Sequence, residues 1–226
     1  MIQLHQVKKA FNQRRPNEFW AIRGVDLRIE PHQATVLKGP SGSGKTTLLS
    51  MIGCLSRPTS GRITLGERSL SGLPERFMTE IRRRTFGFIF QQFNLIKGMT
   101  VLENVMLPAY PLGRDHHQLK QAATDLLRQF GIESKAGSKV EWLSGGEAQR
   151  TAICRALIND PEILIADEPT ANLDTKLSTE FMNIIAGLKA SGKTILLTSH
   201  DPVVFESTVA DRVVEMRDGI VVDRCS

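Results

Sequence analysis

The chain of 226 residues has no long hydrophobic run, few aromatic side chains and only three cysteines. No apolar stretch reaches the roughly 18 residues of a membrane-spanning helix. Cys54, Cys154 and Cys225 lie far apart, without metal-ligand or redox spacing, which indicates free thiols in a reducing compartment. No basic stretch is interleaved with aromatic residues, and we expect no nucleic-acid partner.

The excess of positive charge is modest, because 29 basic and 24 acidic residues leave a formal net charge of +5. Such a charge permits an anionic partner, whether nucleic acid, acidic lipid or nucleotide, but selects none of them. The densest basic run, residues 82–84, is interpreted as a solvated face in preference to a dedicated anion site. Residues 1–9 alternate like a strand and have no long apolar core, so we expect no secretory signal there.

Residues 39–47 carry the pattern G-x-x-x-x-G-K-[ST], which is typical of a phosphate-binding loop. An apolar segment at 34–37 precedes the loop and a helix-forming segment at 47–52 follows it, a context that an ordinary glycine-rich turn does not need. A strand that turns into a helix N-terminus directs several backbone N–H groups at one point, with the positive end of the helix dipole behind them. The residues expected to bind ATP through this loop are Gly39, Pro40, Ser41, Gly42, Ser43, Gly44, Lys45, Thr46 and Thr47.

The remaining pattern predicts an α/β fold with two kinds of sheet. Alternation with period two at 2–7, 25–30 and 61–66 indicates a half-exposed antiparallel sheet. Short apolar strands alternate with helices elsewhere, which argues for a mainly parallel sheet covered on both faces. The segments expected in this second part are strands at 34–37, 85–90, 163–166, 194–198 and 212–216, helices at 74–84 and 175–190, and a hairpin at 215–222.

A helical stretch interrupts this alternation. Helices are expected at 101–106, 115–130 and 146–159, with prolines and glycines between them. We therefore predict a single domain over residues 1–226 with an inserted helical subdomain at about 93–159. The core and the β subdomain are expected to comprise 1–92 and 160–226.

The strand at 163–166 ends in two acidic residues, Asp167 and Glu168. The carboxyl ends of parallel strands gather at one edge of a sheet, where the phosphate-binding loop also opens. Asp167 is therefore expected to hold Mg²⁺ beside the hydroxyl of Thr46, while Lys45 reaches the β- and γ-phosphates. Glu168 is expected to polarise the water that attacks the γ-phosphate. The alternative is an acidic pair that only caps the following turn.

Two further polar residues follow strands that end at the same edge. His200 follows the strand at 194–198 and is expected to contact the γ-phosphate or position the water, although a lone histidine is more often structural. Gln91 follows the strand at 85–90 and offers an amide near Mg²⁺ and water. Gln91 alone is weak evidence for an ATP site, and it counts only together with the phosphate-binding loop and the other strand-end residues.

Residues 143–147, Leu-Ser-Gly-Gly-Glu, form a second glycine-rich segment before a helix. Locally, Ser144 and Glu147 fit a capping box at the helix N-terminus, which leaves the same donors available to phosphate. The segment resembles the signature of ATP-binding cassette (ABC) ATPases. The other motifs of that family follow in the same order over essentially the whole chain, namely residues 39–46, Gln91, 163–168, 171–174 and His200.

This resemblance implies the ABC ATPase fold of the P-loop NTPases, and an ATPase that uses ATP and Mg²⁺. Two copies would pair head to tail, with each ATP between the phosphate-binding loop of one and the signature of the other. Phe11 would stack on adenine, where the family commonly has tyrosine. Asp174 would bridge the two subunits. The signature residues that would contact the ATP bound by the other copy are Ser144, Gly145, Gly146 and Glu147.

The segments 52–61, 88–96 and 100–105 narrow the resemblance to the branch that includes the lipoprotein-releasing ATPase LolD, the macrolide exporter MacB and the cell-division ATPase FtsE. The resemblance implies a peripheral subunit at the cytoplasmic face of the inner or plasma membrane, paired with a separately encoded transmembrane permease. The surface around Gln91, residues 93–95 and the helical subdomain would receive a helix of that permease. Glu147, Ala148, Cys154 and the pair Glu141-Trp142 depart from common family residues, which leaves the ATP chemistry intact and bears on partner contacts.

The favoured interpretation is therefore an ATPase subunit that drives export, such as lipoprotein release or drug and peptide efflux. A cassette that regulates a membrane protein mechanically, as in cell-division control, would carry the same motifs and stays open. A soluble cassette of the translation or DNA-repair type is disfavoured, because the chain holds neither a second cassette nor a long coiled coil. A small-molecule kinase is disfavoured by residues 143–147 and by Glu168.

Overall fold

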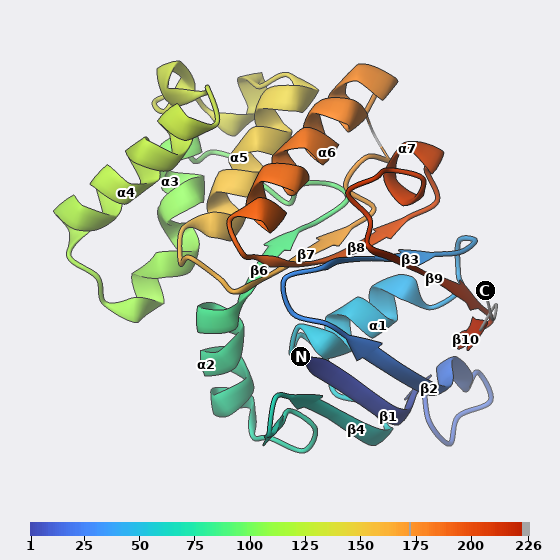
Figure 1. The fold of residues 1–226 in the computed structure, drawn as a ribbon. Coiled ribbons are helices and arrows are strands. Elements are labelled where there is room, and N and C mark those ends of the chain that lie inside the picture. The colour runs from blue at the N-terminus through green and yellow to red at the C-terminus, as the bar shows by residue number, and fades with distance from the viewer. Residues whose placement is uncertain (172, 223–226) are drawn as a thin grey trace.

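The computed structural model describes residues 1–171 and 173–222, so Asn172 of the predicted 171–174 motif and Cys225 lie outside the described residues. The chain forms two sheets with the helix α1 (Lys45–Ile52) between them (Figure 1). The first sheet has the strand order β2-β1-β4-β5, and the second has the order β10-β9-β3-β8-β7-β6.

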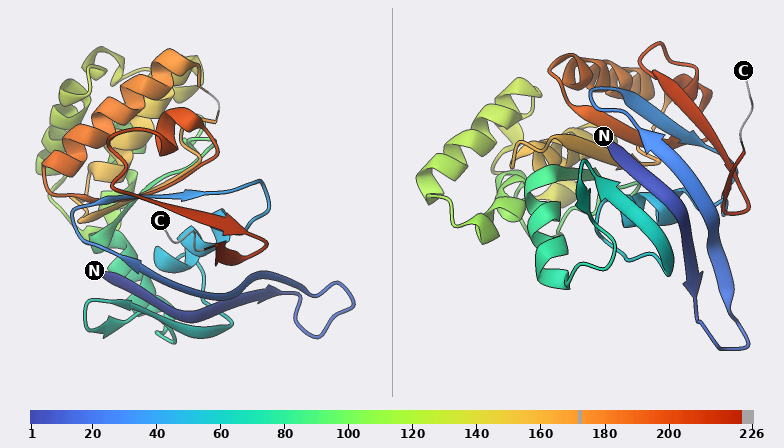
Figure 2. Two further views of the ribbon diagram at one scale, coloured as in Figure 1. Left: turned by 45° about the vertical axis from the view of Figure 1, so that its right-hand side comes forward. Right: turned by 60° about the horizontal axis from the view of Figure 1, so that its bottom comes forward.

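The first sheet is antiparallel throughout, as the alternating segments predicted. Its strands are β1 (Ile2–Phe11), β2 (Phe19–Ile29), β4 (Ser60–Leu65) and β5 (Arg68–Ser69). The strands β1 and β2 are longer than predicted and form a hairpin that extends away from the rest of the chain (Figure 2). Register shifts along β1, with a positive φ of 46° at Gln6, interrupt the strict alternation on which the prediction relied.

The second sheet is parallel except at one edge. Its strands are β3 (Ala34–Lys38), β6 (Phe86–Ile89), β7 (Ile163–Asp167), β8 (Thr194–Ser199), β9 (Arg212–Arg217) and β10 (Ile220–Val222). Only β10 runs antiparallel to its neighbour, because it returns from β9 through the predicted Asp218-Gly219 turn. The predicted fold class, a mainly parallel sheet with an antiparallel β subdomain and added helices, is confirmed by this topology.

Both faces of the parallel sheet are covered, which explains why its central strands are apolar at nearly every position. On one face, Leu37, Ile165 and Leu196 share a core with α1 and the antiparallel sheet. On the other face, Val36, Leu164 and their neighbours pack against helices. The helices that lie over this second face are α5 (Gly145–Leu157), α6 (Thr175–Ala190) and α7 (Pro202–Phe205) (Figure 1).

The helical part of the chain has a third core of its own. The elements around this core are α3 (Val101–Met106), α4 (His116–Gln129) and short 3₁₀ helices at Leu107–Leu112, Glu133–Lys135 and Val140–Trp142. The helix α2 (Glu75–Thr85) belongs to the first core, because its buried residues Met78 and Ile81 pack there. The helix α5 takes part in two cores, because Ile153 packs towards the parallel sheet and Cys154 towards α3 and α4. The bounds of about 93–159 for a helical subdomain remain a prediction.

No helix within residues 1–171 and 173–222 is both long enough and apolar enough to cross a membrane.

Two cysteines are buried, and this burial sets their reactivity. It raises the pKa of the Cys54 thiol to about 11 and that of Cys154 to about 12, because the thiolate is poorly solvated inside the protein. At pH 8 we expect iodoacetamide to modify Cys54 roughly 100-fold more slowly than a thiol of ordinary pKa, since the thiolate is the reacting form. The rate should rise about tenfold per pH unit while the fold persists.

Peptide mass spectrometry of the alkylated protein measures the alkylation rates of Cys54 and Cys154, and the urea-unfolded chain serves as the control. Equal rates for the folded and unfolded chain would contradict the burial of these thiols.

Candidate nucleotide site

A cavity of about 470 Å³ opens over the N-terminus of α1. The lining residues are Phe19, Ala21, Pro40, Ser41, Gly42, Ser43, Gly44, Lys45, Thr46, Thr47, Gln91, Glu168 and His200. Residues 40–47 belong to the loop predicted at 39–47, of which only Gly39 does not line the cavity. Gln91, Glu168 and His200 follow three parallel strands. The cavity therefore brings the loop and the strand ends together, as the topology of a parallel sheet requires.

The loop is shaped by close approaches that only glycine allows. A Cβ atom on Gly39 would lie 2.2 Å from the carbonyl oxygen of Met216, and a Cβ on Gly44 would lie 2.6 Å from that of Ala21. Gly44 also has φ +98° at the first turn of α1, a conformation that other residues rarely adopt. The hydroxyl of Ser43 is buried and finds no hydrogen-bond partner among the described residues. A buried donor without a partner beside a helix N-terminus fits a phosphate group.

Lys45 lies inside the loop. Its side chain is only 6% exposed, and its Nζ donates to the carbonyl oxygens of Gly39 at 2.8 Å and Pro40 at 3.1 Å. The same Nζ lies 3.3 Å from Oε1 of Glu168. The ammonium group is thus held between the loop and the end of β7, with protein oxygens within reach of all three of its N–H donors.

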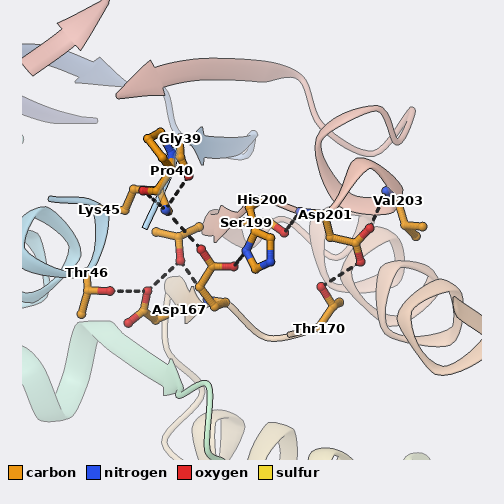
Figure 3. A network of polar contacts seen from close by, with 12 residues as sticks. Gly39, Pro40, Lys45, Thr46, Asp167, Thr170, Ser199, His200, Asp201 and Val203 are labelled. Atoms are coloured by element: carbon orange, nitrogen blue, oxygen red, sulfur yellow. Dashed lines mark hydrogen bonds and ion pairs between the residues drawn. The ribbon is translucent and has the colours of Figure 1, made fainter. Parts of the chain in front are cut away.

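Asp167 and Thr46 meet at the end of β7, with Thr46 Oγ1 donating to Asp167 Oδ1 at 2.9 Å (Figure 3). Thr198 Oγ1 donates to the same oxygen at 2.7 Å. No hydrogen bond reaches Oδ2 of Asp167 from any residue in the described part of the chain. A carboxylate oxygen beside a hydroxyl is the hard-oxygen donor set that Mg²⁺ prefers, so these residues fit that ion.

Glu168 follows Asp167 with a positive φ of 45°. A non-glycine residue adopts this left-handed conformation at an energetic cost, and the conformation ends the extended backbone of β7 at Asp167. Its carboxylate contacts Lys45 through Oε1, and its Oε2 lies 2.8 Å from Nδ1 of His200. Glu168 is 13% exposed, so a partly desolvated carboxylate points into the cavity between a cation and an imidazole.

The signature segment lies elsewhere and does not line this cavity. Ser144 is the N-cap of α5 and forms the predicted capping box with Glu147. Glu147 Oε2 accepts from the Ser144 N–H at 2.8 Å and from its hydroxyl at 3.0 Å, and Lys135 Nζ lies 3.2 Å from Oε1. The Ser144 N–H and then Lys135 lower the pKa of the Glu147 carboxyl. The segment therefore presents an ordered helix N-terminus to solvent.

Contacts connect the signature helix to the end of β7. Gln149 of α5 is 3% exposed and donates through Nε2 to the carbonyl oxygen of Pro169, next to Glu168. Arg150 forms an ion pair with Glu180 of α6 at 2.9 Å. Asp174, the residue predicted to bridge subunits, caps α6 by accepting from Leu177 N at 2.8 Å. The signature, the Glu168 turn and α6 are therefore one packed unit.

The aromatic residue at the cavity differs from the predicted one. Phe11 pairs directly with Phe19 across the β1–β2 hairpin, and Phe19 lines the cavity whereas Phe11 does not. Direct cross-strand partners lie on the same face of a sheet, so Phe11 lies beside Phe19 without itself lining the cavity. Adenine stacking by Phe11 remains a prediction. Phe19 was missed because the sequence pattern placed the start of its strand at residue 25.

The family described as "ABC transporter" matches residues 22–171. The chain belongs to the ABC transporter family. "Uncharacterized ABC transporter ATP-binding protein YknY" of Bacillus subtilis (strain 168) is 38% identical over 226 residues, which cover all of this chain and 97% of the relative.

"Macrolide export ATP-binding/permease protein MacB" of Hyphomonas neptunium is 42% identical over 205 residues. That match covers 91% of this ABC ATPase but 32% of the relative, so the chain spans about a third of the length of the MacB proteins it matches. The resemblance to the branch that contains MacB is thereby confirmed.

Solved structures agree with the fold of this ABC ATPase. "Dimeric Structure of MJ0796, a Bacterial ABC Transporter Cassette" aligns with a TM-score of 0.89 at 37% identity and covers 99% of this chain and 97% of that one. A second structure of the same cassette, described as a post-hydrolysis state bound to ADP and Pi, gives a TM-score of 0.90 at 36% identity. This chain is an ATP-binding protein with ATPase activity, as the family and the structural neighbour establish.

Proposed function

We propose that this ABC ATPase works as a homodimer that closes around two ATP molecules and opens after hydrolysis. The observation that carries the proposal is the separation of two anion-binding elements within one chain. The cavity contains the phosphate-binding loop, whereas Ser144 and its helix N-terminus face solvent outside it. A second copy in head-to-tail arrangement supplies the donors that one chain leaves apart, in keeping with the dimeric cassette MJ0796.

Within each site, the residues divide the work by their chemistry. Lys45 and the loop N–H groups bind the phosphates, and Thr46, Asp167 and Gln91 would hold Mg²⁺. When bound, Mg²⁺ neutralises part of the charge on the phosphate oxygens. Glu168 takes up a proton from the attacking water.

The remaining roles concern orientation. His200 positions the water or the γ-phosphate and holds the Glu168 carboxylate through the contact at 2.8 Å. Phe11 and Phe19 supply the apolar face for the base. Asp174 bridges the subunits close to the water.

We propose that the opening and closing of the ATPase dimer drives a separately encoded transmembrane permease. This subunit would lie at the cytoplasmic face of the inner or plasma membrane. The relative YknY is described as an ABC transporter ATP-binding protein, which supports this assignment. The surface around Gln91 and residues 93–95 would receive a helix of the permease. Arg155 of α5 donates to the carbonyl oxygens of Phe93 and Asn94, which ties this surface to the signature helix.

Export of a drug, peptide or lipoprotein is the transport role that the MacB relatives favour. Mechanical regulation of a membrane protein without transport is the alternative. Co-purification of the membrane partner followed by a transport assay in vesicles separates the two.

Replacement of Ser144 by arginine tests the composite site. The S144R variant places a bulky cation where the partner's phosphate is expected, so turnover should fall by about 10²-fold or more. ATP affinity of the monomer should stay within about twofold, because Ser144 does not line its own cavity. Phosphate release, equilibrium nucleotide binding and light scattering in the presence of ATP provide the three measurements.

The matched control is S134R, which puts the same side chain on an exposed serine of a nearby 3₁₀ helix. Wild-type turnover by S144R, or efficient hydrolysis by a strictly monomeric protein, would refute the composite site.

A further inference from the structure

One threonine hydroxyl touches both acidic residues at the end of β7. Thr198 lies near the end of β8, and its Oγ1 donates to Asp167 Oδ1 at 2.7 Å. The same oxygen accepts the backbone N–H of Glu168 at 2.8 Å. Figure 3 shows the surrounding network, in which Asp167 also receives the hydroxyl of Thr46. A single side chain thus holds two consecutive residues that have different expected roles.

The strand register places Thr198 there. In the parallel pairing of β7 with β8, Thr198 lies opposite Asp167, one step beyond the pair of Ala166 and Leu197. The side chain of Thr198 is fully buried. A buried hydroxyl without partners is costly, whereas this one both donates and accepts, so its orientation is fixed.

We propose that Thr198 is a positioning residue for ATP hydrolysis, which orients the Asp167 carboxylate and fixes the strained Glu168 turn. Its donation to Oδ1 turns Oδ2 of Asp167 towards the space beside Thr46. Its acceptance of the Glu168 N–H stabilises the φ of +45° from which the carboxylate reaches Lys45 and His200. The inference rests on the proposed roles of Asp167 and Glu168.

These contacts predict which constants change. Thr198 lies outside the lining of the cavity, so ATP binding without metal should not depend on it. Hydrogen bonds to ligating carboxylates typically alter metal affinity or activity by about 10- to 100-fold. Loss of the Thr198 hydroxyl should therefore lower kcat and weaken the dependence of ATP affinity on Mg²⁺, while KM for ATP at saturating Mg²⁺ changes little.

The test uses the full chain and three variants. Thr198→Val removes the hydroxyl at nearly constant volume, and Thr198→Ser keeps the hydroxyl while losing a methyl group. Thr35→Val is the matched control, because Thr35 is equally buried on the adjacent strand β3 and its hydroxyl has no partner among the described residues. Thermal unfolding establishes that each variant is folded.

We expect kcat of Thr198→Val to fall about tenfold or more, and Thr198→Ser and Thr35→Val to stay within about threefold of wild type. Equilibrium binding of a fluorescent ATP analogue, with Mg²⁺ and with EDTA, should show that the gain in affinity from Mg²⁺ is reduced about tenfold or more only in Thr198→Val.

A wild-type kcat with a wild-type Mg²⁺ effect in folded Thr198→Val would overturn the proposal. An equal loss in folded Thr198→Ser would do the same, because the hydroxyl would then not be responsible. Glu168→Gln in the same assay separates this result from a failure of the proposed function. If Glu168→Gln is active, the proposed role of Glu168 is refuted. If Glu168→Gln is inactive and Thr198→Val is normal, only the proposed role of Thr198 is refuted.

Discussion

ATP turnover falls by about 10²- to 10⁴-fold when Glu168 is replaced by glutamine, whereas ATP binding is retained; this is the largest effect that we expect. Glutamine preserves the shape of the side chain but cannot accept the proton of the attacking water. The loop, Lys45 and Thr46 are unchanged, so the phosphates keep their ligands. In the proposed cycle hydrolysis reopens the dimer, so the variant should accumulate as an ATP-bound dimer.

Phosphate release measures the turnover, and light scattering after addition of ATP measures the formation of the dimer. Glu162→Gln is the control, because Glu162 is exposed and lies just before the opposite end of β7. Wild-type turnover in Glu168→Gln would show that another group acts as the base. A loss of turnover in Glu162→Gln as well would show that the assay reports a general loss of acidic charge.

Replacement of Lys45 by methionine is expected to weaken ATP binding by about 10²- to 10³-fold, the range for removal of one partner of a buried charge pair. Methionine keeps an unbranched stem, so the packing below the loop is largely retained. The variant loses the donor to the carbonyl oxygens of Gly39 and Pro40 and leaves the 13% exposed carboxylate of Glu168 without its cation. An unpaired carboxylate beside the phosphates adds repulsion to the lost attraction.

Isothermal titration with ATP and Mg²⁺ measures the affinity directly. The control is Lys38→Met, because Lys38 ends the strand that leads into the loop and lies against the ring of Phe205 instead of the cavity. The assignment of Lys45 fails if its variant binds ATP as tightly as Lys38→Met does.

The sequence predicted the cavity mainly through local motifs joined by one topological rule. The glycines and Lys45 identified the phosphate-binding loop, and the apolar segments before Asp167 and His200 identified two parallel strands. Carboxyl ends of parallel strands meet at one edge. The structure places Lys45 and His200 within 3.3 Å of the Glu168 carboxylate, and Asp167 2.9 Å from the Thr46 hydroxyl. The strand order and direction alone bring these residues together at one edge of the sheet.

Other features depend on register and backbone detail that residue patterns do not contain. Thr198 looks like one more β-branched residue of a buried strand, and only its pairing opposite Asp167 gives its hydroxyl a purpose. Phe19 precedes a stretch whose alternation is broken by the register shifts of β1, so its strand looked shorter than it is. The left-handed backbone at Glu168 is set by the contacts around it.

The shared helix α5 has a consequence for recombination between relatives. Since Ile153 and Cys154 are neighbours in sequence but pack into different cores, a crossover inside this helix would combine mismatched packing residues on both of its sides. Chimeras should therefore exchange α5 whole, with joints in the connections before Ser144 and after Asn159.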